Sequence, residues 1–196
     1  MLDLGPAARE LATLLEGVRD DQLDAPTPNE GRTLGDLIDH VGGLSLAFAS
    51  AATKDLGPAS RQGPSADANR LGSDWRTRIP RQLDALAEAW RSPDAWAGMT
   101  RAGGVDLPGA DAGLVALDEL VLHGCDVARA SGQPYRGDQR SLEVVLQFVS
   151  LMSTPENEAG REGLFGPVVD VPADAALLDR VLGLSGRDPS WTSPGR

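Results

Sequence analysis

The chain has 196 residues, 41% of them hydrophobic, with a formal net charge of −11 and a pI of about 4.5. This length and apolar content suit one domain with its own core. The acidic charge argues against nucleic acid or an anionic membrane surface as a partner, because both need clustered cations. No apolar run reaches the roughly 18 residues that predict a membrane span. A single cysteine and an N-terminus without a signal-like pattern predict a cytoplasmic protein without an internal disulfide.

The first quarter of the chain predicts two amphipathic helices separated by a break. Residues 4–23 carry leucines and alanines at helical spacing, and the proline- and glycine-containing residues 25–31 end this helix. Thr33 followed by Asp36 forms a capping-box pattern. A second helix is therefore expected from this cap to about Thr53.

His40 lies on the inward face of this second helix. At about 100° per residue it shares a face with Leu37, Leu44, Ala47 and Ala51. The alanines leave room for another helix or for a ligand. Two interpretations stay open at this point, namely a metal ligand or a core histidine hydrogen-bonded to a carbonyl.

The middle of the chain alternates loops with one further helix. Residues 55–64 are rich in glycine, proline and serine and predict a linker. Residues 66–90 predict a third helix, in which Pro80 must kink the helix or start a second segment. The glycine- and proline-rich residues 92–109 would form a short hairpin or a lid.

The central helix is predicted over residues 110–130 and ends at a Ser-Gly pair. Glu119 and His123 are four residues apart, so they lie one turn apart on one face and can both reach one divalent ion. Asp126 shares that face. The glutamate has largely apolar neighbours, so a metal or a salt bridge must satisfy its charge; a Glu–His contact at a solvated edge is the alternative. Because the second histidine, His40, also faces inward, the sequence favours one metal site shared by the two helices.

The same helix carries a polar stripe formed by Asp118, Cys125 and Arg129, roughly 100° away from the face with Glu119. Polar residues on one stripe usually face water. The stripe therefore predicts an exposed or interfacial thiol at Cys125 rather than a fourth metal ligand.

The last part of the chain predicts two helices around an irregular segment. Residues 139–152 form an apolar fifth helix, residues 154–163 are polar and loop-like, and residues 173–184 form a short last helix. We expect residues 1–153 to form a metal-binding helical bundle. Residues 154–196 are too few for their own core and are expected to pack on that bundle, as parts of one domain.

The motifs in their order resemble the mycothiol-dependent maleylpyruvate isomerase branch of the DinB-like superfamily, and its small actinobacterial metal-binding members in particular. The resemblance extends over nearly the whole chain. It is carried by LDAPTP and TLGDLIDHVGG within residues 23–43, ELVLHGCDVARASG at residues 119–132, and FGP, LDRVL and GRDP within residues 165–189.

The resemblance implies an all-α fold, a DinB-like antiparallel four-helix bundle with extra C-terminal helices and an irregular tail. It implies a metal ligated by His40, Glu119 and His123, with Asp126 as a catalytic group that moves a proton or orients a ligand. Zinc is the expected ion and nickel an alternative, since both accept these donors. The resemblance also implies mycothiol as a thiol cofactor, in a transferase or isomerase reaction on a small electrophile.

The chain departs from the family pattern at three positions. Asn29 stands where cysteine is common, and Arg32 and Cys125 stand where tryptophan is common. None of these departures removes a metal ligand. Arg32 and Arg101 are candidates for binding an acidic substrate.

Other functions stay open at this point. One is a metal- or small-ligand-binding module without turnover, which a fully coordinated metal or a collapsed pocket would favour. Another is a metal-dependent hydrolase, in which an ion with open positions activates water. A homodimer is an open alternative to a monomer, since bundles of this superfamily often dimerise.

Overall fold

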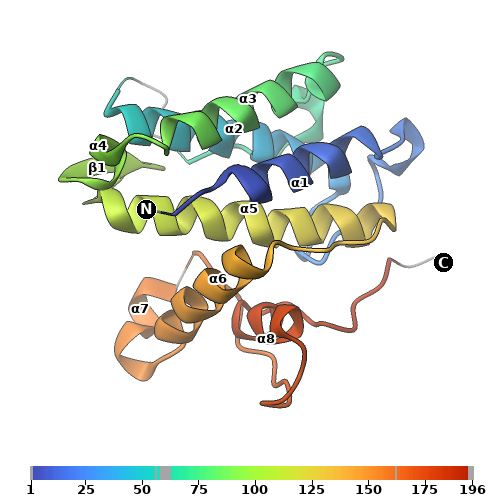
Figure 1. Cartoon of the computed structure of the whole chain (residues 1–196). Coiled ribbons are helices and arrows are strands. Elements are labelled where there is room, and N and C mark those ends of the chain that lie inside the picture. Colours follow the sequence, from blue (N-terminus) through green and yellow to red (C-terminus); the bar gives the residue numbers. More distant parts are fainter. Residues whose placement is uncertain (1, 56, 58–62, 162, 194–196) are drawn as a thin grey trace.

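Helices dominate the computed structural model, which describes residues 2–55, 57, 63–161 and 163–193 (Figure 1). Short 3₁₀ turns occupy Asp20–Gln22, Ala68–Arg70 and Pro155–Asn157. The helices and strands are α1 Gly5–Glu16, α2 Leu34–Thr53, α3 Trp75–Ala89, α4 Pro93–Trp96, β1 Met99–Ala102, β2 Val105–Pro108, α5 Gly109–Ser131, α6 Gln139–Met152, α7 Glu158–Arg161 and α8 Leu177–Leu184.

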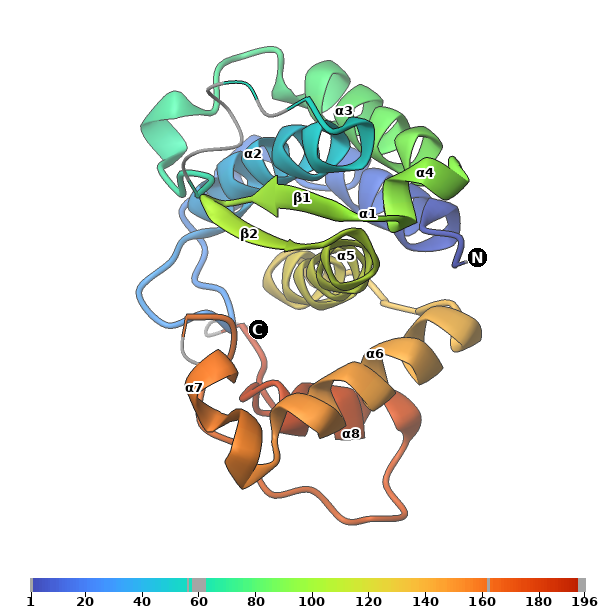
Figure 2. The ribbon, with the colours of Figure 1, turned by 90° about the vertical axis from the view of Figure 1, so that its left-hand side faces the viewer.

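Four helices, α1, α2, α3 and α5, form an antiparallel bundle around one core. Helices α1 and α2 each pack against both α3 and α5. Seen end-on, α5 lies between the rest of the bundle and the layer of α6 and α8 (Figure 2). Most residues of α5 are therefore buried. A helix covered on most sides needs apolar residues on most of its circumference, as α5 has. The predicted all-α four-helix fold is confirmed, and no described helix is both long and apolar enough to cross a membrane.

A β-hairpin precedes α5, as one of the two alternatives for residues 92–109 predicted. Strand β1 pairs antiparallel with β2, with Met99 opposite Pro108 and Ala102 opposite Val105. The hairpin is held on α2 by the Thr100 hydroxyl, which donates to the carbonyl oxygen of Ala51 at 2.6 Å.

The capping box of α2 forms as predicted. The Thr33 hydroxyl accepts a hydrogen bond from the Asp36 backbone N–H at 3.2 Å, and the Asp36 carboxylate accepts one from the Thr33 N–H at 2.9 Å. Both orphan donors at the start of the helix are thereby satisfied. The cap fixes where α2 begins and so the depth at which His40 enters the bundle.

The third helix starts later than predicted, at Trp75 instead of residue 66. Carboxylates on α2 bind the backbone of the preceding segment: Asp36 accepts from the Ala68 N–H at 2.8 Å, and Asp39 accepts from the Asp67 N–H at 3.2 Å. These long-range bonds hold the segment against α2 as a loop.

Pro80 lies inside α3, which continues through it, so of the two alternatives predicted for this proline a second segment is not the one formed. The predicted linker at residues 55–64 lies largely outside the described residues.

The C-terminal part matches the prediction in α6 and departs from it in two places. Helix α6 covers the predicted residues and packs against α5 and α8. The expected loop at 154–163 contains α7, whose Arg161 donates hydrogen bonds to the Ser153 hydroxyl and to the Leu184 carbonyl. Helix α8 begins at Leu177, four residues after the predicted start. The division into a bundle of residues 1–153 and an extension of residues 154–196 stays a prediction.

Candidate metal centre

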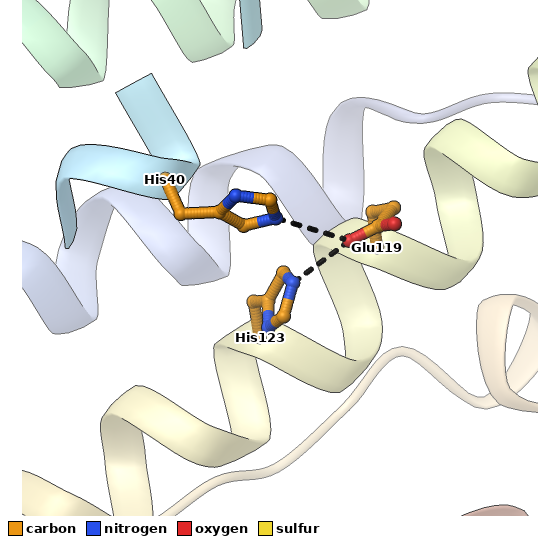
Figure 3. A group of neighbouring side chains, drawn as sticks. All are labelled: His40, Glu119 and His123. Atoms are coloured by element: carbon orange, nitrogen blue, oxygen red, sulfur yellow. Dashed lines mark ion pairs between the residues drawn. The ribbon is translucent and has the colours of Figure 1, made fainter. Parts of the chain in front are cut away.

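Three side chains from two helices meet inside the bundle. His40 extends from the middle of α2, and Glu119 and His123 extend from successive turns of α5 toward it (Figure 3). Glu119 Oε2 lies 2.8 Å from His123 Nε2 and 3.9 Å from His40 Nε2. One potential ligand atom from each residue lies within 4.8 Å of the other two.

This arrangement fits a divalent metal ion. In a tetrahedral site with bonds of about 2.0–2.2 Å, the donor atoms lie roughly 3.3–3.6 Å apart. The 2.8 and 3.9 Å separations bracket that value, so small side-chain rotations would bring the donors onto one ion. Two imidazoles and one carboxylate leave coordination positions open, which is typical of catalytic zinc sites. The identity of the metal stays a prediction.

Asp126 orients His123 within this group. Its Oδ2 lies 3.2 Å from His123 Nδ1, and its side chain is fully buried. A carboxylate on one ring nitrogen fixes the ring and directs the other nitrogen toward a metal. The geometry therefore favours the orienting role among the two roles expected for Asp126, and a role in proton transfer stays a prediction.

Two further residues hold Asp126 in place. Arg187 donates from Nε to Oδ1 and from Nη2 to Oδ2, each at 2.9 Å, and the Asn29 amide donates to Oδ2 at 2.9 Å. A bidentate guanidinium is the strongest common partner of a carboxylate. The residue-by-residue reasoning missed Arg187, because it lies in the irregular tail after α8; the only signal was its place in the GRDP motif.

Mutual charge interactions stabilise the cluster. Burial acts to raise the pKa of Glu119, but the hydrogen bond from His123 and the nearby His40 hold it well below its usual range. Burial acts to lower the pKa of His123, but the carboxylates of Asp126 and Glu119 raise it to about 9. Glu119 is therefore ionised at neutral pH, which is the form that binds metals, and metal binding would displace the proton from His123.

A cavity of about 620 Å³ opens onto the three side chains. This volume is within the usual range for small-molecule sites. One wall comes from α2, α5 and the loops around residues 28–32 and 64–66, and the other comes from residues 163–167 and 185–187. The C-terminal part thus completes a site whose potential metal ligands all lie on the bundle.

The predicted polar stripe on α5 is largely buried, which contradicts the expectation of exposure. Asp118 is 4% and Cys125 1% exposed. The tail covers this side of the helix, since Arg187 binds Asp126 and Arg129 Nη1 donates to the carbonyl of Asp188 at 2.9 Å. Burial raises the pKa of Cys125 to about 11, so its thiol is not a ready nucleophile.

The two arginines suggested for an acidic substrate lie in different places. Arg32 lines the cavity and donates to the Ala66 carbonyl at 3.1 Å. Arg101 lies on the hairpin, paired with Asp106 at 2.7 Å, and does not line the cavity. Arg32 and Arg187 are therefore the arginines that line the cavity among the described residues.

Comparison with known proteins finds similarity to mycothiol-dependent maleylpyruvate isomerases. The family model described as mycothiol maleylpyruvate isomerase N-terminal domain matches residues 4–128. A crystal structure of the mycothiol-dependent maleylpyruvate isomerase superposes with a TM-score of 0.60 and 17% sequence identity, over 96% of this chain and 79% of that one. A histidine-to-alanine mutant of that isomerase gives a TM-score of 0.57 and 16% identity with the same coverage. No curated protein sequence matches.

Proposed function

Since the chain belongs to the mycothiol maleylpyruvate isomerase N-terminal domain family and has its DinB-like bundle, we propose that it is a metal- and thiol-dependent transferase or isomerase. Its thiol would be mycothiol and its substrate a small electrophile. The observation that carries this proposal is the group of His40, Glu119 and His123 on the wall of a 620 Å³ cavity.

The three side chains would hold the metal, with zinc as the expected ion. A bound divalent cation would supply a Lewis acid that lowers the pKa of a thiol in the cavity, and the thiolate is the reactive nucleophile. Asp126 keeps Nε2 of His123 directed at the ligand group through its contact with Nδ1. The chain's own contribution is thus a fixed set of donors beside a cavity that can admit a thiol and an electrophile together.

An acidic substrate would find its cationic partners on two sides of the cavity. Arg187 lines the cavity, and its Nη1 makes only a long contact of 3.5 Å with the Ser185 hydroxyl, so it can still donate to a carboxylate. Arg32 lines the cavity from the loop before α2 and is exposed. Guanidinium groups match planar carboxylates in geometry as well as charge.

Elemental analysis of untagged protein is the first test. We expect about one equivalent of metal in the wild type. His123→Ala and His40→Ala should each lose the metal, because only two of the three ligands remain in each variant. Glu143→Ala, which removes a partly exposed carboxylate on α6 that does not line the cavity, is the control and should keep the metal.

Titration calorimetry with mycothiol and a panel of electrophiles would then test the reaction. Thiol binding and thiol-dependent turnover by the metal-loaded protein, both lost in His123→Ala, are the expected results. Metal-loaded protein that binds no thiol and shows no thiol-dependent turnover would refute the proposal. Turnover of esters or amides without thiol would instead favour a metal-dependent hydrolase, and binding without any turnover a non-catalytic module.

A further inference from the structure

Asp118 is a buried polar residue, and one of its carboxyl oxygens lacks a hydrogen-bond partner in the described part of the chain. It immediately precedes Glu119 on α5, is 4% exposed, and lines the cavity. Its Oδ1 is buried without a hydrogen-bond partner among the described residues. Buried polar oxygens in native proteins nearly always have a partner, so each exception needs an explanation.

The two arginines near Asp118 direct most of their hydrogen bonds to other residues. Arg187 directs Nε and Nη2 to Asp126, and its Nη1 lies 3.5 Å from the Ser185 hydroxyl. Arg129 donates to the Asp188 carbonyl through Nη1. Neither guanidinium forms a hydrogen bond with Asp118 in the described structure, and the cavity that Asp118 lines is a place from which a partner for its carboxyl group can come.

We propose that Asp118 forms a polar subsite of the cavity that hydrogen-bonds a hydroxyl group of the bound small molecule. A hydroxyl group can both donate and accept, so it satisfies a carboxyl oxygen whether or not that carboxyl carries a proton. The subsite would select a hydroxyl-bearing thiol over an alkyl thiol of the same length. This inference rests on the proposed function, because it assumes that a thiol enters the cavity.

The proposal predicts that one substitution lowers the selectivity of ligand binding and raises the stability of the free protein. If Oδ1 forms a hydrogen bond only when a ligand is bound, the free protein has an unpaired buried oxygen. Replacing Asp118 by leucine then removes an unfavourable group from the free protein. We therefore expect Asp118→Leu to raise the melting temperature of the metal-free protein by a few degrees while it abolishes selectivity for hydroxyl groups. A residue with a purely structural role would lower stability and leave selectivity unchanged.

A series of matched thiols provides the probe. Linear mercapto-alcohols of two to six carbons are compared with alkanethiols of the same length, by titration calorimetry on metal-loaded protein of measured metal content. For the wild type we expect the alcohol to bind about three- to tenfold more tightly at the length that reaches Asp118, as expected for one additional net hydrogen bond. In Asp118→Leu this ratio should fall to about one.

Two further variants control for charge and folding. Asp118→Asn keeps the shape and should give an intermediate ratio, whereas Glu30→Gln removes a negative charge from an exposed residue of the same cavity and should keep the wild-type ratio. Equal affinities for both series in the wild type, or the same ratio in wild type and Asp118→Leu, would overturn the subsite. Failure of the metal-loaded wild type to bind any thiol would overturn the proposed function itself.

Discussion

The ion pair between Arg187 and Asp126 joins the tail to the bundle next to the potential metal ligands. Two 2.9 Å hydrogen bonds connect them, and their side chains are 9% and 0% exposed. Replacing Arg187 by methionine leaves the Asp126 carboxylate buried with only His123 and Asn29 as polar partners. We expect this single change to be strongly destabilising.

The expected loss is about 3–5 kcal/mol in the free energy of unfolding, the usual result of removing one partner of a buried ion pair. A protein of this size has a total stability of about 5–15 kcal/mol, so the variant would remain folded but with a small margin. Most of the loss is the desolvation of a charge left unpaired. Replacing both partners should therefore cost less than the sum of the two single changes.

Urea unfolding in the presence of a chelator would measure these energies for wild type, Arg187→Met, Asp126→Asn and the double variant. We expect a coupling energy of at least about 2 kcal/mol, within the range for residues in direct contact. Arg101→Met is the matched control, because Arg101 forms a similar two-bond pair with Asp106 on the exposed hairpin. Its urea midpoint should not change measurably.

A loss below about 1 kcal/mol in Arg187→Met would refute this reasoning, since water would then have to reach Asp126 freely. Strict additivity of the two single changes would refute it as well, because independent sites add and coupled ones do not.

Three further predictions concern the supports of the fold. Gly132→Ala should cost about 1 kcal/mol in thermal unfolding, because the residue that ends α5 has a φ of +69°. Glu10→Ala should cost about 1 kcal/mol and speed hydrogen exchange at Gly137, whose N–H bonds the Glu10 carboxylate at 3.0 Å. Thr33→Ala should cost about 1 kcal/mol at pH 7. The Thr33 N–H, and to a lesser degree the Thr33 hydroxyl, lower the pKa of Asp36, so the stability from this cap is present above the unfolded pKa near 4 and is lost as pH falls through the lower folded pKa. Acid titration should show a smaller loss in Thr33→Ala than in the wild type, because alanine keeps the N–H but lacks the hydroxyl.

Local patterns in the sequence predicted the helices whose ends are determined locally. Helix α6 matched because Asp138 caps it and apolar residues repeat along it at helical spacing. The start of α3 was wrong by nine residues, since Asp36 and Asp39 hold the preceding loop from another helix. Helix α7 was missed because the hydrogen bonds of its Arg161 go to partners outside its own turn, which no local pattern reveals.

In the candidate site, too, local patterns predicted some residues, whereas others depend on how distant segments pack. Glu119 and His123 were recognisable as a pair because four residues of helix bring them together. His40 was associated with them because it is the second of two histidines, faces inward on its own helix and belongs to the ligand set that the family resemblance implies. The structure places it 3.9 Å from Glu119. Arg187, 61 residues after Asp126, and the buried state of Asp118 depend on how the tail packs, which no local pattern encodes.

The cavity is therefore lined partly by helices and partly by loops and the C-terminal tail. Helices α2 and α5 supply the potential metal ligands, whereas Asn29, Arg32 and Arg187 come from loops and the tail. Two of these loop residues, Asn29 and Arg32, are positions where the chain departs from the family pattern, and Asn29 also bonds Asp126. Changes in such segments alter the groups around a ligand without moving the helices that carry the potential metal ligands, because loops tolerate substitution more readily than a packed bundle does. This arrangement would allow the loops and the tail to change the lining of the cavity while the helical bundle, which a solved structure only 17% identical to this chain also has, stays the same.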